Sequence, residues 1–345
     1  MAIKNPIQRF KARLRGDEHT REMLLGSVVA LLVKILAAFS AFLMYVVLAR
    51  KLGASEAGLF YLGIAIVTFT SAFGRMGLDN TIVRFVAAER AARNDGVVVS
   101  VYRHAVLWTS LLSVACGLLV YLFADFLSDQ VFRKDGFHSA LSILAVSIPL
   151  LALSILHSQA LQGLKRIAES MTILNVSIPI LVLCGVLVLP GNTARQAAIL
   201  YAGASALTLF LAYFWWRRSA PYSVTRSKFP PSTLLASCLP LWSVVIFTQI
   251  IQWSSQLLLG LWGTPEEIAF FASASRTAML TSFVLIAVNS IAAPKFAGMY
   301  RNGDMAGLRR TALLSVRVML FAALPILILM LLVPEWLMGL FGPEF

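Results

Sequence analysis

Nine apolar runs of about 20 residues each divide this chain, and they constrain its fold more than any other feature. A helix of that length rises about 30 Å, the thickness of the hydrocarbon core of a bilayer. Hydrophobic residues make up 59% of the 345 residues and charged residues only 13%, more apolar surface than a soluble protein of this size can bury. We therefore expect an all-α integral membrane protein with nine transmembrane helices. The expected spans are 24–49, 57–77, 102–123, 140–162, 169–189, 194–216, 237–260, 267–292 and 311–333.

A sequence repeat links the two parts of the chain. Residues Leu52–Tyr61 return in altered form 210 positions later as Trp262–Phe271, and both copies keep a glycine, a small or turn-forming pair, a glutamate and an aromatic doublet. The offset covers six expected spans, so both copies enter the membrane in the same sense. This pattern predicts two parallel-repeat helical lobes around a central cavity, an arrangement typical of transporters.

The repeat also predicts the domain organisation. We expect a basic tail over 1–23, an N-terminal six-helix lobe over 24–216, a linker over 217–236 and a partial C-terminal lobe of three helices over 237–345. Two complete lobes would need about 420 residues, so we expect this chain to be C-terminally incomplete and to lack roughly three helices, as a fragment or a truncated gene product.

The positive charges indicate an orientation. With the N-terminus and tail in the cytoplasm, 21 of the 29 lysines and arginines lie in cytoplasmic segments and five in outer loops. Such a bias sets the topology of multi-pass proteins. Because the net charge of +13 is spread over short loops, it favours membrane orientation over a nucleic-acid partner.

Two cations lie deep in expected spans. Lys34 and Tyr45 share one face of the first span, and Arg276 lies near the middle of the eighth. A buried cation is costly in lipid, so it should face protein or a wet cavity, where it would prefer an anion such as phosphate or pyrophosphate. The alternatives stay open: Lys34 could snorkel or pack, and Arg276 could bind helix-end carbonyls. Arg317 lies close to further arginines, and snorkelling accounts for it better.

A polar stripe follows the seventh span. Gln249, Gln252 and Gln256 share it with Trp242. Glutamines can bond to a neighbouring helix. The alternative is that they bind sugar hydroxyls beside Trp242 or Trp253, since aromatic faces suit sugar rings.

A similar alignment in the second span comprises Tyr61, Thr68 and Arg75, with Arg75 near the cytoplasmic end. The candidate substrate-binding residues are Lys34, Tyr45, Thr68, Arg75, Gln249, Gln252, Gln256 and Arg276.

Catalytic chemistry has no support in the pattern of residues. We find no phosphate-binding glycine loop, metal-ligand spacing, paired carboxylates or nucleophile elbow. The cysteines Cys116, Cys184 and Cys238 lie in or beside apolar runs without a pairing pattern. We expect no enzyme activity, no catalytic residue, no metal and no cofactor.

Several stretches resemble the polysaccharide flippases of the multidrug/oligosaccharidyl-lipid/polysaccharide exporter superfamily. They are 46–58, which contains Leu52-Gly53-Ala54-Ser55-Glu56, then Gly77-Leu78-Asp79, Arg84-Phe85 and the ending Leu340-Phe341-Gly342-Pro343-Glu344-Phe345.

This resemblance implies a twelve- to fourteen-helix fold with two lobes and a cavity lined by helices 1, 2, 7 and 8. It implies translocation of polyprenyl-pyrophosphate-linked oligosaccharides across a bacterial inner membrane by alternating access. The implied partners are the lipid-linked anionic oligosaccharide, membrane lipid and polysaccharide polymerase machinery. The lipid II branch of the superfamily places basic residues where this chain has Met44 and Tyr45, so an O-antigen, capsule or exopolysaccharide unit fits better as cargo.

Three other functions compete. A multidrug exporter of the same superfamily would prefer a buried carboxylate, which we do not find in mid-span. A membrane polymerase or ligase would need a large outer loop, whereas the longest here is about 124–139. A non-transporting membrane scaffold is the third alternative.

Overall fold

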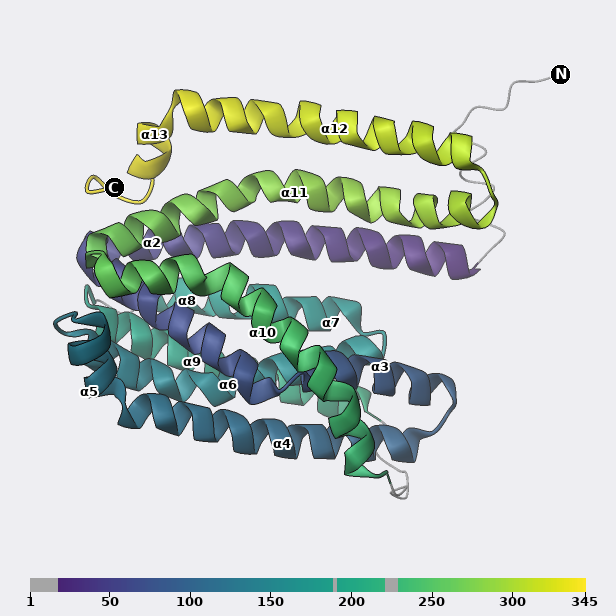
Figure 1. Ribbon diagram of the computed structural model, residues 1–345, viewed down its shortest axis with the longest axis horizontal. Coiled ribbons are helices and arrows are strands. Elements are labelled where there is room, and N and C mark those ends of the chain that lie inside the picture. The colour runs from purple at the N-terminus through teal and green to yellow at the C-terminus, as the bar shows by residue number, and fades with distance from the viewer. Residues whose placement is uncertain (1–17, 189–190, 221–228) are drawn as a thin grey trace.

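The computed structural model describes residues 18–188, 191–220 and 229–345, and these ranges contain helices and no strand (Figure 1). In chain order the helices are α2 (Glu18–Arg75), α3 (Leu78–Ala91), α4 (Asp95–Leu122), α5 (Ala124–Phe126), the π-helical η1 (Leu127–Phe132), α6 (Phe137–Gly163), α7 (Ile167–Thr172), the π-helical η2 (Ile173–Ser177), α8 (Ile178–Val188), α9 (Ala194–Ser219), α10 (Pro231–Trp262), α11 (Pro265–Arg301), α12 (Met305–Leu332) and α13 (Pro334–Gly339). The all-helical prediction is confirmed for these residues.

Seven helical segments in the described part of the chain are long and apolar enough to cross a membrane. The first, Val33–Arg75, takes in parts of the first two expected spans, because α2 continues through the sequence between them. The eighth expected span, 267–292, lies within α11, which is not among the seven. The chain is thus a multi-pass membrane protein, with seven candidate segments where the sequence predicts nine.

A sharp kink divides α2 into a first limb (18–52) and a second limb (54–75). Gly53 has φ 74° and ψ 172°, a left-handed φ that side chains with a Cβ rarely adopt. From this point the second limb crosses to the group containing α6 and α9, while the first limb runs beside α11 (Figure 1). The kink therefore places one helix in contact with both parts of the chain.

The two copies of the repeat have similar local structure. Gly53 breaks α2 and Gly263 separates α10 from α11, each with an extended ψ near 170°. In the second copy Glu267 accepts a hydrogen bond from the Thr264 backbone nitrogen at 2.8 Å. In the first copy the equivalent nitrogen, of Ala54, donates to a carboxylate oxygen of Glu344, near the end of the chain, at 2.8 Å. A distant glutamate thus supplies the cap that position 57, an alanine, lacks.

Two of the sequence stretches that carry the family resemblance meet at this kink. The Arg50 guanidinium Nε donates to the backbone carbonyl of Leu340 at 2.6 Å, beside the contact between Ala54 and Glu344. The two stretches lie about 290 residues apart in the chain. Their proximity gives a physical reason for both motifs.

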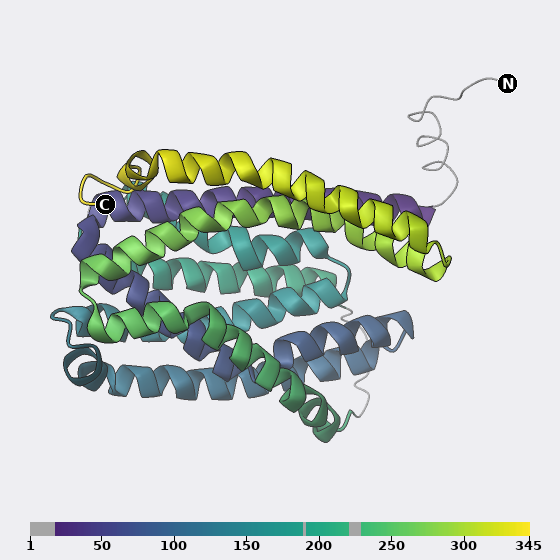
Figure 2. The same ribbon diagram turned by 45° about the horizontal axis from the view of Figure 1, so that its top comes forward.

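The helices pack in a consistent order in both views. The first limb of α2, α11 and α12 lie along one edge, and α4 lies toward the opposite one (Figure 2). Between them α6 contacts α4, α9 and the second limb of α2, and over half of the residues in its most apolar stretch are buried. None of the residues of α12 is buried.

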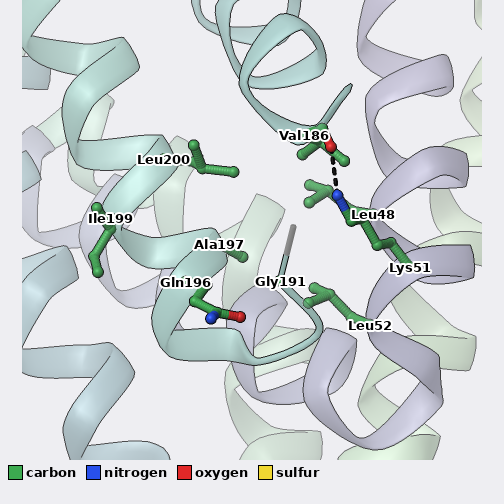
Figure 3. A pocket seen from close by; sticks show the side chains of 9 residues that line it. All are labelled: Leu48, Lys51, Leu52, Val186, Gly191, Gln196, Ala197, Ile199 and Leu200. Atoms are coloured by element: carbon green, nitrogen blue, oxygen red, sulfur yellow. Dashed lines mark hydrogen bonds between the residues drawn. The ribbon is translucent and has the colours of Figure 1, made fainter. Parts of the chain in front are cut away.

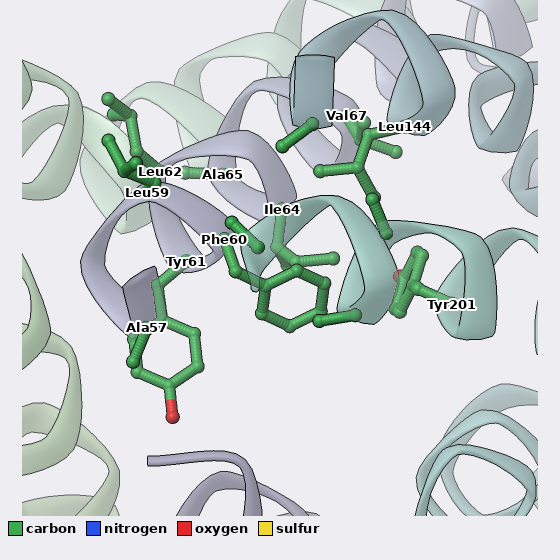
Figure 4. Close-up of a cluster of buried hydrophobic side chains, with 14 of the residues drawn as sticks. Ala57, Leu59, Phe60, Tyr61, Leu62, Ile64, Ala65, Val67, Leu144 and Tyr201 are labelled. Carbon is green, nitrogen blue, oxygen red and sulfur yellow. The ribbon is translucent and has the colours of Figure 1, made fainter. Parts of the chain in front are cut away.

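The main buried cluster is built around the second limb of α2. Phe60, Tyr61 and Leu62 lie in it with Leu144 of α6 and Tyr201 of α9 (Figure 4). In lipid, helix association depends on close packing and small residues rather than on the exclusion of water.

Gly58 shows how tightly the second limb of α2 packs. A Cβ built on Gly58 would lie 1.7 Å from the backbone carbonyl oxygen of Pro265, at the start of α11. Only glycine fits where these two helices meet.

Two of the predicted domain boundaries fall partly outside the described residues. Of the expected tail 1–23, residues 1–17 lie outside them, and α2 already begins at Glu18. Of the expected linker 217–236, residues 221–228 lie outside them. Helix α9 extends to Ser219 and α10 begins at Pro231, so helix occupies both ends of that segment. The lobes 24–216 and 237–345 stay predictions.

Candidate functional site

Arg276 lies where α2, α10 and α11 meet, held by aromatic side chains. Its Nη2 donates to the hydroxyl of Tyr45 at 3.0 Å, and its Nη1 donates to the Sδ of Met279 at 3.5 Å. Its Cζ lies 4.7 Å from the ring centroid of Tyr45 and 5.5 Å from that of Trp253. Stacking on two ring faces stabilises a cation, by roughly 0.5–2 kcal/mol per contact. Three helices therefore position this guanidinium.

The kink in α2 prepares this position. Tyr45 precedes Gly53 by eight residues and Tyr61 follows it by eight, so the two tyrosines come to the same level on the two limbs. Their ring centroids are 4.7 Å apart, and the Tyr61 hydroxyl donates to the Tyr45 backbone carbonyl at 2.9 Å. The limbs are thereby locked together beside Arg276.

The charge on Arg276 has no carboxylate partner among the residues that the structure describes. It lies eleven residues from Pro265, or about 16 Å along α11 at 1.5 Å per residue, which is about half the thickness of a hydrocarbon core. A half-buried guanidinium whose neighbours are neutral has spare affinity for an anion. Of its five N–H donors, two are used in the contacts above.

Helix α10 carries unpaired polar groups on the helix face whose Trp253 contacts this cation. The side-chain atoms Oε1 of Gln249, Nε1 of Trp253 and Nε1 of Trp242 are buried and have no hydrogen-bond partner within the described ranges. The spacings of seven and four residues put all three on one face of the helix. Unpaired buried polar atoms are costly, so these three atoms are candidates for further hydrogen bonds.

The other two glutamines of the stripe are placed differently. Gln256 is buried, and its Nε2 donates to the Tyr61 backbone carbonyl at 2.8 Å, which ties α10 to the second limb of α2. Gln252 is exposed. Thr68 is half-buried, and its backbone carbonyl accepts a bond from the Ser71 hydroxyl.

Arg75 is engaged by its own surroundings. Its Nε contacts the Asp79 carboxylate and its Nη1 contacts the Ser71 hydroxyl, both at 2.9 Å. Both members of the ion pair are buried, with side chains 5% and 8% exposed. The pair spans the turn between α2 and α3, so Arg75 holds that turn.

Lys34 is exposed and lies on the first limb of α2, eleven residues before Tyr45. That separation is about 16 Å along the helix. Lys34 and Arg276 therefore stand at different depths, and the structure joins Arg276 to Tyr45 and Gln256 to the adjacent Tyr61 without Lys34.

A separate apolar cavity of about 180 Å³ lies between the first limb of α2 and the α8–α9 region (Figure 3). Its one cationic wall residue, Lys51, donates from Nζ to the backbone carbonyl of Val186 in the last turns of α8. This lysine stabilises a helix end. Within the described ranges, no group of His, Cys, Asp and Glu side chains could hold a metal ion.

Tyr61 and Trp253 belong to this site; the sequence offers Trp253 as a partner for sugar rings and aligns Tyr61 with Thr68 and Arg75, but neither is among the candidate binding residues. Trp253 lies four residues from Gln249, on the same face of α10, and this spacing is the signal that could have selected it. The role of Tyr61 depends on the kink at Gly53. In the sequence, only the glycine at this position hints at the kink.

Residues 23–299 match a family model described as "Polysaccharide biosynthesis protein". No curated protein matches the chain. Among solved structures, it is similar to an inward-facing multidrug resistance MATE family transporter of the MOP superfamily, with a TM-score of 0.68 and 17% identity over 92% of this chain and 76% of that one. It is also similar to the MATE multidrug transporter DinF-BH, with a TM-score of 0.60 and 13% identity over 93% of this chain and 74% of that one. These structures share the fold of the chain.

Proposed function

Because the chain belongs to the polysaccharide biosynthesis protein family, we propose that it moves polyprenyl-pyrophosphate-linked oligosaccharide repeat units between membrane leaflets. The movement runs from the cytoplasmic to the periplasmic leaflet of a bacterial inner membrane, by alternating access, and supplies polysaccharide biosynthesis. The observation that carries this proposal is the uncompensated Arg276 guanidinium, held at mid-depth by Tyr45 and Trp253.

We propose that the chain crosses the membrane nine times, in two parallel-repeat lobes, with its N-terminus in the cytoplasm. The two limbs of α2 act as spans one and two, α10 as span seven and α11 as span eight. These are the elements that meet around Arg276, and the kink at Gly53 connects the lobes. The excess of basic residues in the alternate loops supports the orientation.

In this mechanism Arg276 binds the pyrophosphate. Its remaining N–H groups form charge-assisted bonds to phosphoryl oxygens, which a planar guanidinium can make in pairs. Gln249, Trp253 and Trp242 then offer their unpaired polar atoms to sugar hydroxyls, and the tryptophan rings offer faces to sugar rings. Each sugar hydroxyl then forms the hydrogen bond that one of these protein atoms otherwise lacks.

The hydrocarbon tail stays outside this polar site. An open apolar groove of about 300 Å³ lies between Phe69 on α2, Phe132 on η1 and the α10 residues Ile250, Leu257 and Leu261. A groove of this composition lets an isoprenoid chain remain in lipid while the head group crosses.

Lys34 serves as an earlier contact for the anion. It stands about 16 Å from Tyr45 toward the N-terminal end of the same helix, on the side from which the cargo enters in this orientation. Transfer of one negative charge to the positive outside is favoured by about 2.3 kcal/mol per 100 mV, so the membrane potential biases export.

The proposal is tested by removing the protein from its host. The deletion strain should accumulate a lipid-linked oligosaccharide in the cytoplasmic leaflet and lose the surface polymer. Wild-type protein should restore the polymer, and Arg276→Gln should not, at equal protein level in the membrane. Arg317→Gln removes an exposed charge from α12 and is the matched control. Full polymer with Arg276→Gln would overturn the proposed site.

A multidrug exporter is the second candidate, favoured by the fold shared with two multidrug transporters. Expression in a strain without drug pumps distinguishes the two. A cationic dye should accumulate equally with and without the protein if the flippase proposal holds. Reduced accumulation would favour the exporter.

A further inference from the structure

A second basic site lies far from Arg276, where α3, α6 and α9 end. It is an open pocket of about 350 Å³ with a largely polar wall, lined by Arg90, Leu164, Arg166, Arg218 and Ser219. The three arginines come from three different elements: the last turn of α3, the turn after α6 and the last turn of α9. The fold, and not a local run of basic residues, brings them together.

Two of these arginines have acidic neighbours, and one does not. Arg90 pairs with Asp95, and Arg166 pairs with Glu169 at 2.9 Å, with arginine side chains 50% and 51% exposed. Exposed pairs of this kind are weak and leave most guanidinium donors free. Arg218 has no carboxylate partner among the residues that the structure describes. The pocket therefore carries a net positive charge and unused hydrogen-bond donors.

The pocket has aromatic and basic neighbours. Arg218 is in the last turn of α9, and exposed Tyr213 and Phe214 precede it by about one turn. The adjacent Arg217 stacks on the Tyr213 ring, with 6.0 Å from Cζ to the ring centroid. Aromatic and basic side chains in this order mark the boundary between hydrocarbon and water. Leu164 adds an apolar side chain to the wall.

We propose that this pocket binds the phosphate headgroup of an anionic membrane phospholipid. The three guanidinium groups bind the phosphodiester oxygens, and the acyl chains extend along the exposed faces of the neighbouring helices. A phosphate group is the shared chemistry of a lipid and a soluble anion, and the position at the membrane boundary favours the lipid. The site does not involve Arg276 or the cargo. The result of a test of lipid binding therefore does not decide the proposed function.

The test is a binding titration on the purified full chain in neutral detergent, read by native mass spectrometry. The probes are phosphatidylglycerol, phosphatidylcholine of equal chain length, inorganic phosphate and inorganic pyrophosphate. One variant carries Arg90→Gln, Arg166→Gln and Arg218→Gln, and a second carries Arg218→Gln alone. The matched control, Arg103→Gln with Arg301→Gln and Arg309→Gln, removes the same charge from exposed arginines outside the pocket.

We expect the first equivalent of phosphatidylglycerol to bind wild-type protein and the control at least tenfold more tightly than phosphatidylcholine. The triple pocket variant should lose roughly 100-fold, since each arginine near an anionic headgroup contributes about 1 kcal/mol. The single Arg218→Gln variant, which breaks no ion pair, should lose several-fold with an unchanged circular dichroism spectrum. Equal losses in the control and pocket variants would overturn the proposal. Displacement of the lipid by micromolar phosphate or pyrophosphate would assign the pocket to a soluble anion and overturn it as well.

Discussion

Replacing Arg276 by glutamine tests the anion site by removing a single guanidinium group. The substitution keeps a polar side chain of intermediate length and removes the positive charge that Tyr45 and Trp253 hold. A hydrogen bond to a charged group contributes about 1.5–3 kcal/mol net. Of five N–H donors, two have protein partners, so three are free for the pyrophosphate. We take about 2–3 kcal/mol as the loss, which is roughly 30- to 140-fold in the dissociation constant.

The assay is equilibrium binding of a short-chain polyprenyl-pyrophosphate disaccharide to purified protein in detergent. Arg276→Lys keeps the charge but not the planar fork, so it should bind between wild type and Arg276→Gln. Tyr45→Phe keeps the ring contact and loses the hydroxyl, which should weaken binding by about 0.5–1.5 kcal/mol through misplacement of the guanidinium. Arg317→Gln should bind as wild type. Equal affinity in Arg276→Gln and wild type, with both folded, would refute the reasoning.

Three predictions concern stability and are measured by thermal unfolding in detergent. Gly58→Ala should cost about 1–3 kcal/mol, because its Cβ would clash with a backbone carbonyl of α11, and an unchanged melting temperature would contradict that close approach. Asp79→Asn should cost about 3–5 kcal/mol by leaving Arg75 buried without a counter-charge, whereas the double change Arg75→Met with Asp79→Leu should cost clearly less; equal losses would count against a buried pair. Glu344→Ala should cost about 0.5–2 kcal/mol, because the Ala54 nitrogen loses its cap, and an unchanged melting temperature would count against this contact.

Much of the fold follows from the chain's apolar runs. Each expected span lies within or largely within helix, because a backbone in lipid must satisfy its own hydrogen bonds. The sequence does not reveal that the first two spans form one kinked element. Only Gly53, with its left-handed φ, hints at the change of direction, and a glycine alone does not fix an angle.

The site is predictable where a contact follows helical spacing or depth. The depth of Arg276 and the helix face of Tyr45 select both residues, and the structure places them in contact. Arg75 is selected by its alignment with Thr68, yet Asp79 stands four residues later, and this i, i+4 spacing is a visible signal of an ion pair. The stacking of Trp253 on Arg276 joins two helices, and no spacing within one helix reveals it.

The central claim is transport of a lipid-linked anion, and one measurement addresses it most directly. Purified protein is reconstituted into vesicles with a fluorescent polyprenyl-pyrophosphate oligosaccharide, and the fraction of label exposed to a membrane-impermeant quencher is followed with time. We expect rapid exchange between leaflets with wild-type protein and Arg317→Gln, and exchange near that of empty vesicles with Arg276→Gln. Wild-type vesicles that exchange the label no faster than empty vesicles would contradict it.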